Sequence, residues 1–172
     1  FYHRHCTENT FCAYIINLAH FDVPKICQFI KMNKNENSRS SWQTFVQDNL
    51  LYANILDGIL LITSYGEQIY SWGPKVKNDC EQFKGVFNSI TEKQDVAICQ
   101  KGFTLEKDDN VKVHYKVYKK SLCSMYCMSE NRQSGLIVCN LPYGMLITTY
   151  SQPVKAQDAV ELVENACTLL RN

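Results

Sequence analysis

The alternating run VKVHYKVYKK at residues 111–120 constrains the fold more than any other segment. Its odd positions from 111 to 117 are valine, valine, tyrosine and valine, and its even positions are Lys112, His114, Lys116, Tyr118 and Lys120. Successive side chains of a β-strand point to opposite faces of the sheet. The pattern therefore predicts a strand with one apolar face and one basic, solvated face, which is typical of an antiparallel sheet.

Neighbouring segments supply the other strands of this sheet. Turn residues separate five short runs that predict an antiparallel meander with the strand above, at 95–99, 102–106, 121–129, 135–141 and 144–150. LPYG at 141–144 predicts a tight turn between the last two. The continuous apolar run ILLIT at 59–63 predicts a buried central strand, and QIYSW at 68–72 predicts the strand that returns beside it.

Three segments show helical spacing instead. SSWQTFVQDNLL at 40–51 begins with an S-x-x-Q capping box, which places Trp42 in the first turn of a helix. Residues 78–90 predict a short second helix, and the wide apolar stripe of residues 156–170 predicts a third. The order of these elements predicts an α+β domain built on one antiparallel sheet with helices packed on its faces.

The first 40 residues form a separate part of the sequence. Met32 opens the polar, turn-rich tract MNKNENSRSS, which is typical of a linker or a ragged terminus. We therefore divide the chain into an N-terminal extension at 1–40 and a domain at 41–172. We interpret residues 1–31 as an accessory or artefactual segment. The alternatives are a poorly ordered extension, an amphipathic helix at 11–21 or translated upstream sequence.

Composition excludes several classes of function. The net charge of +1 gives no global field that would favour nucleic acid. The nine cysteines are irregularly spaced, which indicates reduced thiols in a cytosolic protein rather than a disulfide framework. The longest apolar run, FCAYIINLAHF, is shorter than the roughly 20 residues that a membrane span needs.

Catalytic and metal-binding patterns are weak. The sequence has no P-loop, dinucleotide fingerprint or G-x-S-x-G elbow. Cys123 and Cys127 are expected to share a strand face, but C-x3-C alone is a weak zinc signal. HRHC at 3–6 could bind a metal, although it lies in the separate extension. We therefore expect a binding module without cofactor or metal, and not an enzyme; an enzyme would need a cleft that brings His114 to a cysteine.

The domain resembles the profilin family. SWQTFVQDNLL is similar to the signature that opens the family's fold, and GEQIYSWG is similar to the strand after its first hairpin turn, which carries a second tryptophan. KGFTLE resembles the family's G-L-x-L/I segment. GLIVCNLPYGMLITTYSQPVKAQDAVELVENACTLL resembles its last two strands and C-terminal helix. The resemblance covers about residues 41–172.

The resemblance implies a fold and a function. The fold would be a central antiparallel sheet with the N- and C-terminal helices on one face and a short helix on the other. The function would be that of a cytoplasmic, cytoskeletal protein, monomeric itself, that binds monomeric actin, regulates filament assembly and docks proline-rich ligands. Phosphoinositide lipids at the membrane surface are a further implied partner, and nucleic acid is not.

Three sets of residues follow from the resemblance. For proline-rich ligands they are Trp42, Phe45, Tyr70, Trp72, Leu169 and Leu170. For actin they are Lys112, Lys116, Arg132, Lys155, Glu164 and Asn165. For phosphoinositides they are Lys112, Lys116, Lys119 and Lys120. The alternatives without ligand binding are that Trp42 only packs between the terminal helices and that the lysines form a solvated face.

Two other functions stay open at this point. One is a profilin-like protein with weakened actin binding that acts on filament ends or phosphoinositides. The other is a longin-like trafficking or scaffold module, which explains the alternation of strands and helices but not the pairing of Trp42 with Trp72.

Overall fold

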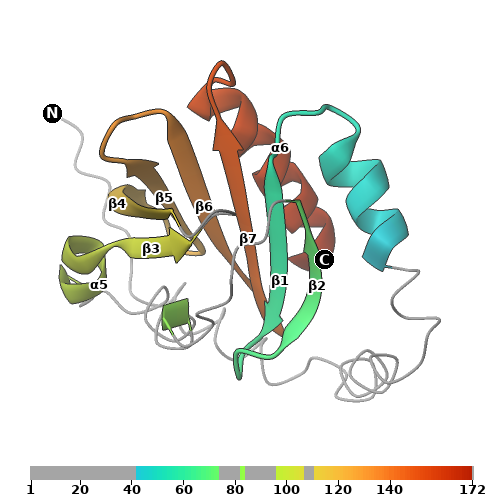
Figure 1. Cartoon of the computed structure of the whole chain (residues 1–172). Coiled ribbons are helices and arrows are strands. Elements are labelled where there is room, and N and C mark those ends of the chain that lie inside the picture. The colour runs from blue at the N-terminus through green and yellow to red at the C-terminus, as the bar shows by residue number, and fades with distance from the viewer. Residues whose placement is uncertain (1–41, 74–81, 84–95, 107–110, 172) are drawn as a thin grey trace, which may run out of the picture.

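A computed structural model describes residues 42–73, 82–83, 96–106 and 111–171, and Figure 1 shows them arranged around one curved sheet. The sheet is antiparallel throughout and contains seven strands in the order β2-β1-β7-β6-β5-β4-β3. The strands are β1 (Gly58–Thr63), β2 (Gln68–Trp72), β3 (Phe103–Glu106), β4 (Lys112–Lys120), β5 (Ser124–Ser129), β6 (Ser134–Leu141) and β7 (Gly144–Ser151). The predicted α+β class with one antiparallel sheet is confirmed.

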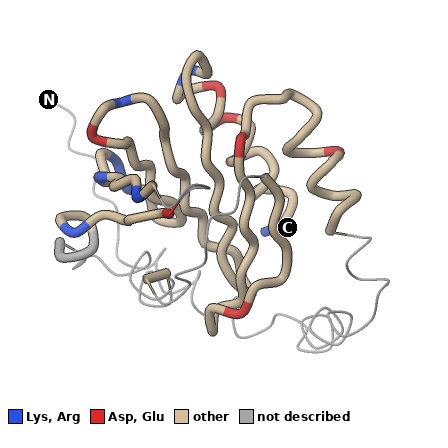
Figure 2. The backbone as a smooth tube through the Cα atoms, viewed as in Figure 1, with Lys and Arg blue, Asp and Glu red and all other residues tan. Residues whose placement is uncertain are grey.

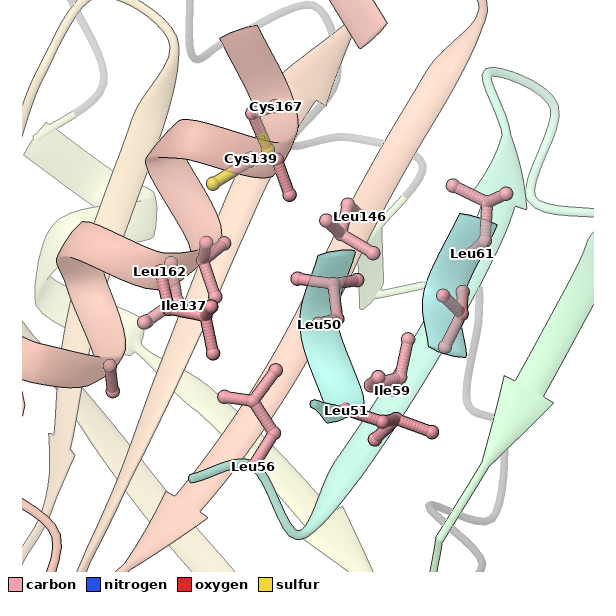
Figure 3. Packing of buried hydrophobic residues seen from close by; sticks show 14 of the residues in the cluster. Leu50, Leu51, Leu56, Ile59, Leu61, Ile137, Cys139, Leu146, Leu162 and Cys167 are labelled. Atoms are coloured by element: carbon pink, nitrogen blue, oxygen red, sulfur yellow. The ribbon is translucent and has the colours of Figure 1, made fainter. Parts of the chain in front are cut away.

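The N-terminal and C-terminal helices lie together on one face of this sheet. Residues 42–46 are helical and continue into the π-helical turn η1 (Gln47–Leu51), and the chain ends in α6 (Ala156–Arg171), which contacts β6, β7 and η1. Figure 3 shows Leu50 beside β1 and Leu162 of α6 beside Ile137 of β6. Both helices therefore bury their apolar stripes in one shared core, which is the arrangement that the resemblance implied.

A second core fills the opposite face. Phe83, in a helical position, stacks on Phe103 of β3, with ring centroids 5.3 Å apart and an interplanar angle of 15°. The side-chain amide of Gln82 donates to the carbonyl of Thr104 at 3.0 Å and accepts from its N–H at 3.1 Å. This amide satisfies backbone groups on the outer side of an edge strand, where unpaired groups invite aggregation. The rest of the predicted helix at 78–90 lies outside the described residues.

The strand predicted at 95–99 is wrong. Residues 96–101 form the short helix α5 (Val96–Lys101), which packs on β4. A short apolar run without alternation fits a helix turn as well as a strand. The helix ends at Gly102, whose φ of 65° is left-handed, and a Cβ there would lie 2.2 Å from the carbonyl oxygen of Tyr115.

Two further predictions about strands need correction. β1 is buried as predicted, but it lies second from the sheet edge, between β2 and β7, rather than at the centre. In β4 the simple alternation breaks at a bulge between Val117 and Lys119. Beyond it Lys119 pairs with Tyr126 and Lys120 with Met125. A bulge inserts one residue and shifts the parity of every side chain that follows it.

The bulge changes the composition of the basic face. Tyr126 belongs to the core under the terminal helices, and Met125 to the opposite core. Since directly opposed residues share a face, Lys119 joins Lys112 and Lys116 on the helix-bearing face. Lys120, predicted to be part of that stripe, lies on the other face.

Candidate ligand-binding surfaces

An aromatic cluster forms where the N-terminal helix meets the β6–β7 turn. The Trp42 ring lies 6.0 Å from Phe45, edge-on at 82°, and 6.1 Å from Tyr143, tilted at 52°. Edge-to-face rings at this separation attract each other beyond the area that they bury. Trp42 is only 6% exposed, whereas Phe45 and Tyr143 are half-buried. Trp42 therefore acts as the base of the cluster, and its two neighbours form the accessible part.

Tyr70 and Trp72 extend the same face along β2. They pair with Leu61 and Ile59, both of which lie in the core under the terminal helices. Tyr70 is half-buried against that core, and burial raises the pKa of its hydroxyl. Trp72 is 40% exposed at the sheet edge, so its ring is available to a ligand.

The end of α6 completes this surface. Leu170 packs on the core that holds Trp42, and Leu169 is 60% exposed beside it. All six residues predicted for proline-rich ligands thus lie on the helix-bearing face. Four of them lie in or against the core under the terminal helices. Sequence reasoning missed Tyr143, because LPYG was interpreted only as a turn. An aromatic residue beside proline in a hairpin turn was the available signal.

Basic residues gather in another part of the molecule. Figure 2 shows Lys and Arg positions at α5, over β4, in the β5–β6 turn, in the connection before α6 and at the end of α6. Residues 42–73 contain no lysine or arginine but three acidic residues, Asp48, Asp57 and Glu67. The described domain is therefore polarised: apart from Arg171 at the end of α6, its cations lie in α5, β4, the β5–β6 turn and the connection before α6, and none lies in β1 or β2.

A hollow of about 510 Å³ lies within the basic region. Arg132, in the β5–β6 turn, and Lys155, just before α6, both line it, so the structure brings these two predicted actin residues together. Apolar lining comes from Met128, Tyr150 and Val154. Within the described residues neither cation has an ion-pair partner.

A row of residues across four strands explains the shape of the hollow. Lys116, Met128, Gly135 and Tyr150 are successive partners in the sheet. A Cβ at Gly135 would lie 2.1 Å from Cζ of Tyr150, so the tyrosine ring crosses β6 only because position 135 is glycine. The ring then lines the hollow, and burial raises the pKa of its hydroxyl to about 12.

The remaining predicted actin residues fall into different environments. Lys112 is exposed, and Lys116 pairs with Glu130 at 3.0 Å with both side chains exposed. Asn165 is exposed on α6. Glu164 instead turns toward the sheet, where its carboxylate accepts a hydrogen bond of 2.8 Å from the Tyr126 hydroxyl.

The predicted phosphoinositide residues are less uniform than their spacing indicated. Lys119 holds its ammonium 5.8 Å from the centre of the Tyr126 ring, a cation–π arrangement. Lys120 faces the opposite side of the sheet. The lysines on the helix-bearing face are thus Lys112, Lys116 and Lys119, and Lys116 is already paired with an acid.

No metal centre forms in the part of the chain that the structure describes, where no three His, Cys, Asp or Glu residues gather. Cys123 lies in the turn before β5 and Cys127 is buried in the core opposite the terminal helices, so the prediction that both share a strand face is wrong. Burial raises the pKa of the Cys127 thiol to about 12. HRHC at 3–6 lies outside the described residues, and no described helix is long and apolar enough to cross a membrane.

Comparisons with known proteins agree on one family. A family model described as Profilin matches residues 40–172. Acanthamoeba castellanii profilin II is 21% identical, with a TM-score of 0.61, over 76% of this chain and 96% of that one. A search of curated protein sequences found no match.

Similar solved structures include complexes with ligands. LokiProfilin2 in complex with rabbit actin is 20% identical, with a TM-score of 0.57, over 77% of this chain and 96% of that one. Mouse profilin IIa in complex with a double repeat from the FH1 domain of mDia1 is 17% identical, with a TM-score of 0.53, over 76% and 96%. At these identities the likeness establishes the fold.

Proposed function

Because the chain belongs to the profilin family, a non-enzymatic actin-binding family, we propose that it binds monomeric actin and docks proline-rich segments. The observation that carries this proposal is the family match over residues 40–172. In this role the protein acts as a cytoplasmic monomer that regulates filament assembly. The two ligands use different surfaces, so one molecule can hold both.

The actin surface consists of β4, the β5–β6 turn and the start of α6. Lys112, Lys116, Arg132 and Lys155 are exposed there, and Asn165 is exposed in the second half of α6. Arg132 and Lys155, which have no ion-pair partner among the described residues, suit an acidic partner surface, and the apolar lining of the hollow between them accepts a side chain. Complementary charge speeds association and fixes orientation, while burial of the apolar lining supports affinity.

The proline-rich surface lies at the other end of α6. A polyproline II helix is ordered before it binds, so it loses little entropy on docking along aromatic and apolar side chains. Phe45, Tyr143 and Leu169 offer two accessible rings and a leucine at that end, with Trp42 as the buried base. Trp72 is accessible farther along the same face, level with Ile59 of β1 and Thr148 of β7. Tyr70 and Leu170 pack beneath this surface.

Phosphoinositide headgroups are a further proposed ligand. Lys112, Lys116 and Lys119 share the helix-bearing face, and Lys120 lies on the opposite one. Lysines close to an anionic leaflet contribute about 1 kcal/mol each. The actin surface also uses Lys112 and Lys116, so lipid and actin would compete for them.

Pyrene-labelled actin tests the first ligand. We expect excess protein to slow spontaneous nucleation, because bound monomers are withheld from new filaments. A folded protein that leaves the lag phase unchanged would contradict actin binding. Adding vesicles that contain phosphoinositides should restore nucleation, and neutral vesicles serve as the control.

A poly-L-proline resin tests the second ligand independently. We expect the protein to be retained and the variant Leu169→Ser to elute earlier, since this exposed leucine contributes contact area without supporting the core. Leu122→Ser is the matched control, because Leu122 is also exposed but lies in the turn before β5. Passage of the folded wild-type protein without retention would contradict proline-rich docking.

A further inference from the structure

Glu164 is held by groups from three elements. Its Oε1 accepts from the Tyr126 hydroxyl of β5 at 2.8 Å and lies 3.7 Å from the Cys139 thiol of β6. Its Oε2 lies 3.2 Å from Nη1 of Arg171, at the end of its own helix. A half-buried carboxylate needs such compensation, because burial without partners disfavours the charged form.

Arg171 carries the contact on to the sheet. Its Nε and Nη2 both donate to the carbonyl of Asn140, at 3.1 and 3.0 Å, while Nη1 faces Glu164. A cation in the last turn also complements the negative end of the helix dipole. The last two turns of α6 are thus tied to β5 and β6 through one acid and one arginine.

The two leucines of the proposed proline-rich site lie inside this tied segment. Leu169 and Leu170 come just before Arg171 and within two turns after Glu164. Helix ends fray because their last carbonyls lack partners within the helix. A frayed last turn would carry Leu170 away from the core that holds Trp42, and Leu169 with it. The contacts of Glu164 and Arg171 oppose this fraying.

We propose that Glu164 is a positioning residue for proline-rich ligands. Through Tyr126 and Arg171 it holds the last turn of α6 against the sheet, with Leu170 on the core that holds Trp42 and the exposed Leu169 available to the ligand. This role rests on the proposed proline-rich function. It replaces the direct actin contact that the resemblance implied, since the carboxylate faces inward.

The variants Glu164→Gln, Arg171→Met and their double test this role. Affinity for poly-L-proline would be measured by tryptophan fluorescence titration, and actin binding by the nucleation assay. We expect each single variant to bind poly-L-proline on the order of 5-fold more weakly, and the double to be no weaker than the worse single. Nucleation should be slowed as by the wild type.

Two controls separate positioning from general destabilisation. Glu161→Gln removes an exposed charge one turn earlier on α6 and should leave both assays unchanged. Val163→Ala should lower the melting temperature through core loss without changing poly-L-proline affinity, because Val163 is fully buried in the middle of the helix. Hydrogen exchange should show faster exchange of the last-turn amides in Glu164→Gln but not in Val163→Ala.

The possible outcomes are distinct. If Glu164→Gln binds poly-L-proline as tightly as the wild type does, the positioning role alone is overturned. A Glu164→Gln variant that loses actin binding but keeps poly-L-proline affinity returns Glu164 to the actin surface. A folded wild type with no affinity for poly-L-proline overturns the proline-rich function and this role with it. Weaker, non-additive poly-L-proline binding with unchanged nucleation supports the role.

Discussion

The two ends of α6 differ in how their charged residues are engaged. At the start, Lys155 and the nearby Arg132 line a hollow, and neither has an ion-pair partner among the described residues. At the end, Nη1 of Arg171 donates to Glu164, and its Nε and Nη2 donate to the carbonyl of Asn140. One end leaves its cations free, and the other uses its cation internally.

This difference indicates what each end can recognise. Free cations beside an apolar hollow suit a partner with acidic groups around an apolar side chain, because complementary charges guide association. At the far end the charge of Arg171 is engaged by internal contacts, and the accessible side chains are aromatic rings and leucine. A neutral, pre-ordered segment such as a polyproline II helix loses little on docking there, since no charge has to be desolvated without a partner.

The largest expected effect is at the aromatic end. Trp42→Ala should reduce the free energy of unfolding by about 3–5 kcal/mol, the range for truncating a buried large aromatic residue. Its 6% exposure makes it part of the core rather than a free platform. Urea unfolding followed by circular dichroism measures the loss.

Trp72→Ala is the matched control for that variant. Its ring is 40% exposed on an edge strand, so stability should change far less while poly-L-proline affinity falls. Equal losses of stability in the two variants would show that the division between buried base and accessible rings is mistaken.

Strong periodicity explains what the sequence could predict. The stripe of α6, with Ala159, Val163 and Ala166 on the buried side, repeats over four turns and leaves little ambiguity. The paired strands β6 and β7 are long, and a two-residue turn joins them. These elements carry most of the sheet and one wall of each proposed surface, so the fold followed from local patterns.

Features that depend on distant pairing could not be predicted. The bulge after Val117 cannot be recognised from the sequence of the strand. It exchanges the faces of Lys119 and Lys120 relative to a regular strand, so that Lys119 and not Lys120 lies on the helix-bearing face. The hollow requires Tyr150 to cross β6 at Gly135, which only the register of three strands reveals. Such contacts depend on tertiary structure, and the β-propensity of the individual residues does not predict them.

A smaller effect is expected at the charged end. Reversing both free cations, in Arg132→Glu with Lys155→Glu, should weaken actin binding on the order of tenfold, or 1.4 kcal/mol, and more at low salt. Stability should stay within about 0.5 kcal/mol, since both side chains are exposed and neither has an ion-pair partner in the described part of the chain. The nucleation assay at several protein concentrations measures the change.

Lys101→Glu is the control for charge alone. Lys101 is exposed at the end of α5, away from the hollow, so its reversal changes net charge without touching the surface. An equal loss of actin binding in this variant would assign the effect to the overall field and leave the hollow without a role.

The smallest expected effect concerns the hydrogen bond that ties β5 to the end of α6. Tyr126→Phe removes the donor to Glu164 and should cost about 1 kcal/mol of stability at neutral pH. Burial, with the Glu164 carboxylate as the second cause, raises the pKa of Tyr126 from 10.0 to about 12. The unfolded chain therefore loses this proton at lower pH than the folded one. The contribution is fully present below pH 10 and is lost as pH rises through about 12.

Urea unfolding of both proteins from pH 8 to 12 should show the wild-type advantage shrinking above pH 10. Other buried tyrosines titrate in both proteins, so only the difference between the two curves reports on Tyr126. A difference that stays constant across this range would mean that the hydroxyl is not held against Glu164, and Arg171 alone would then tie the end of α6 to the sheet.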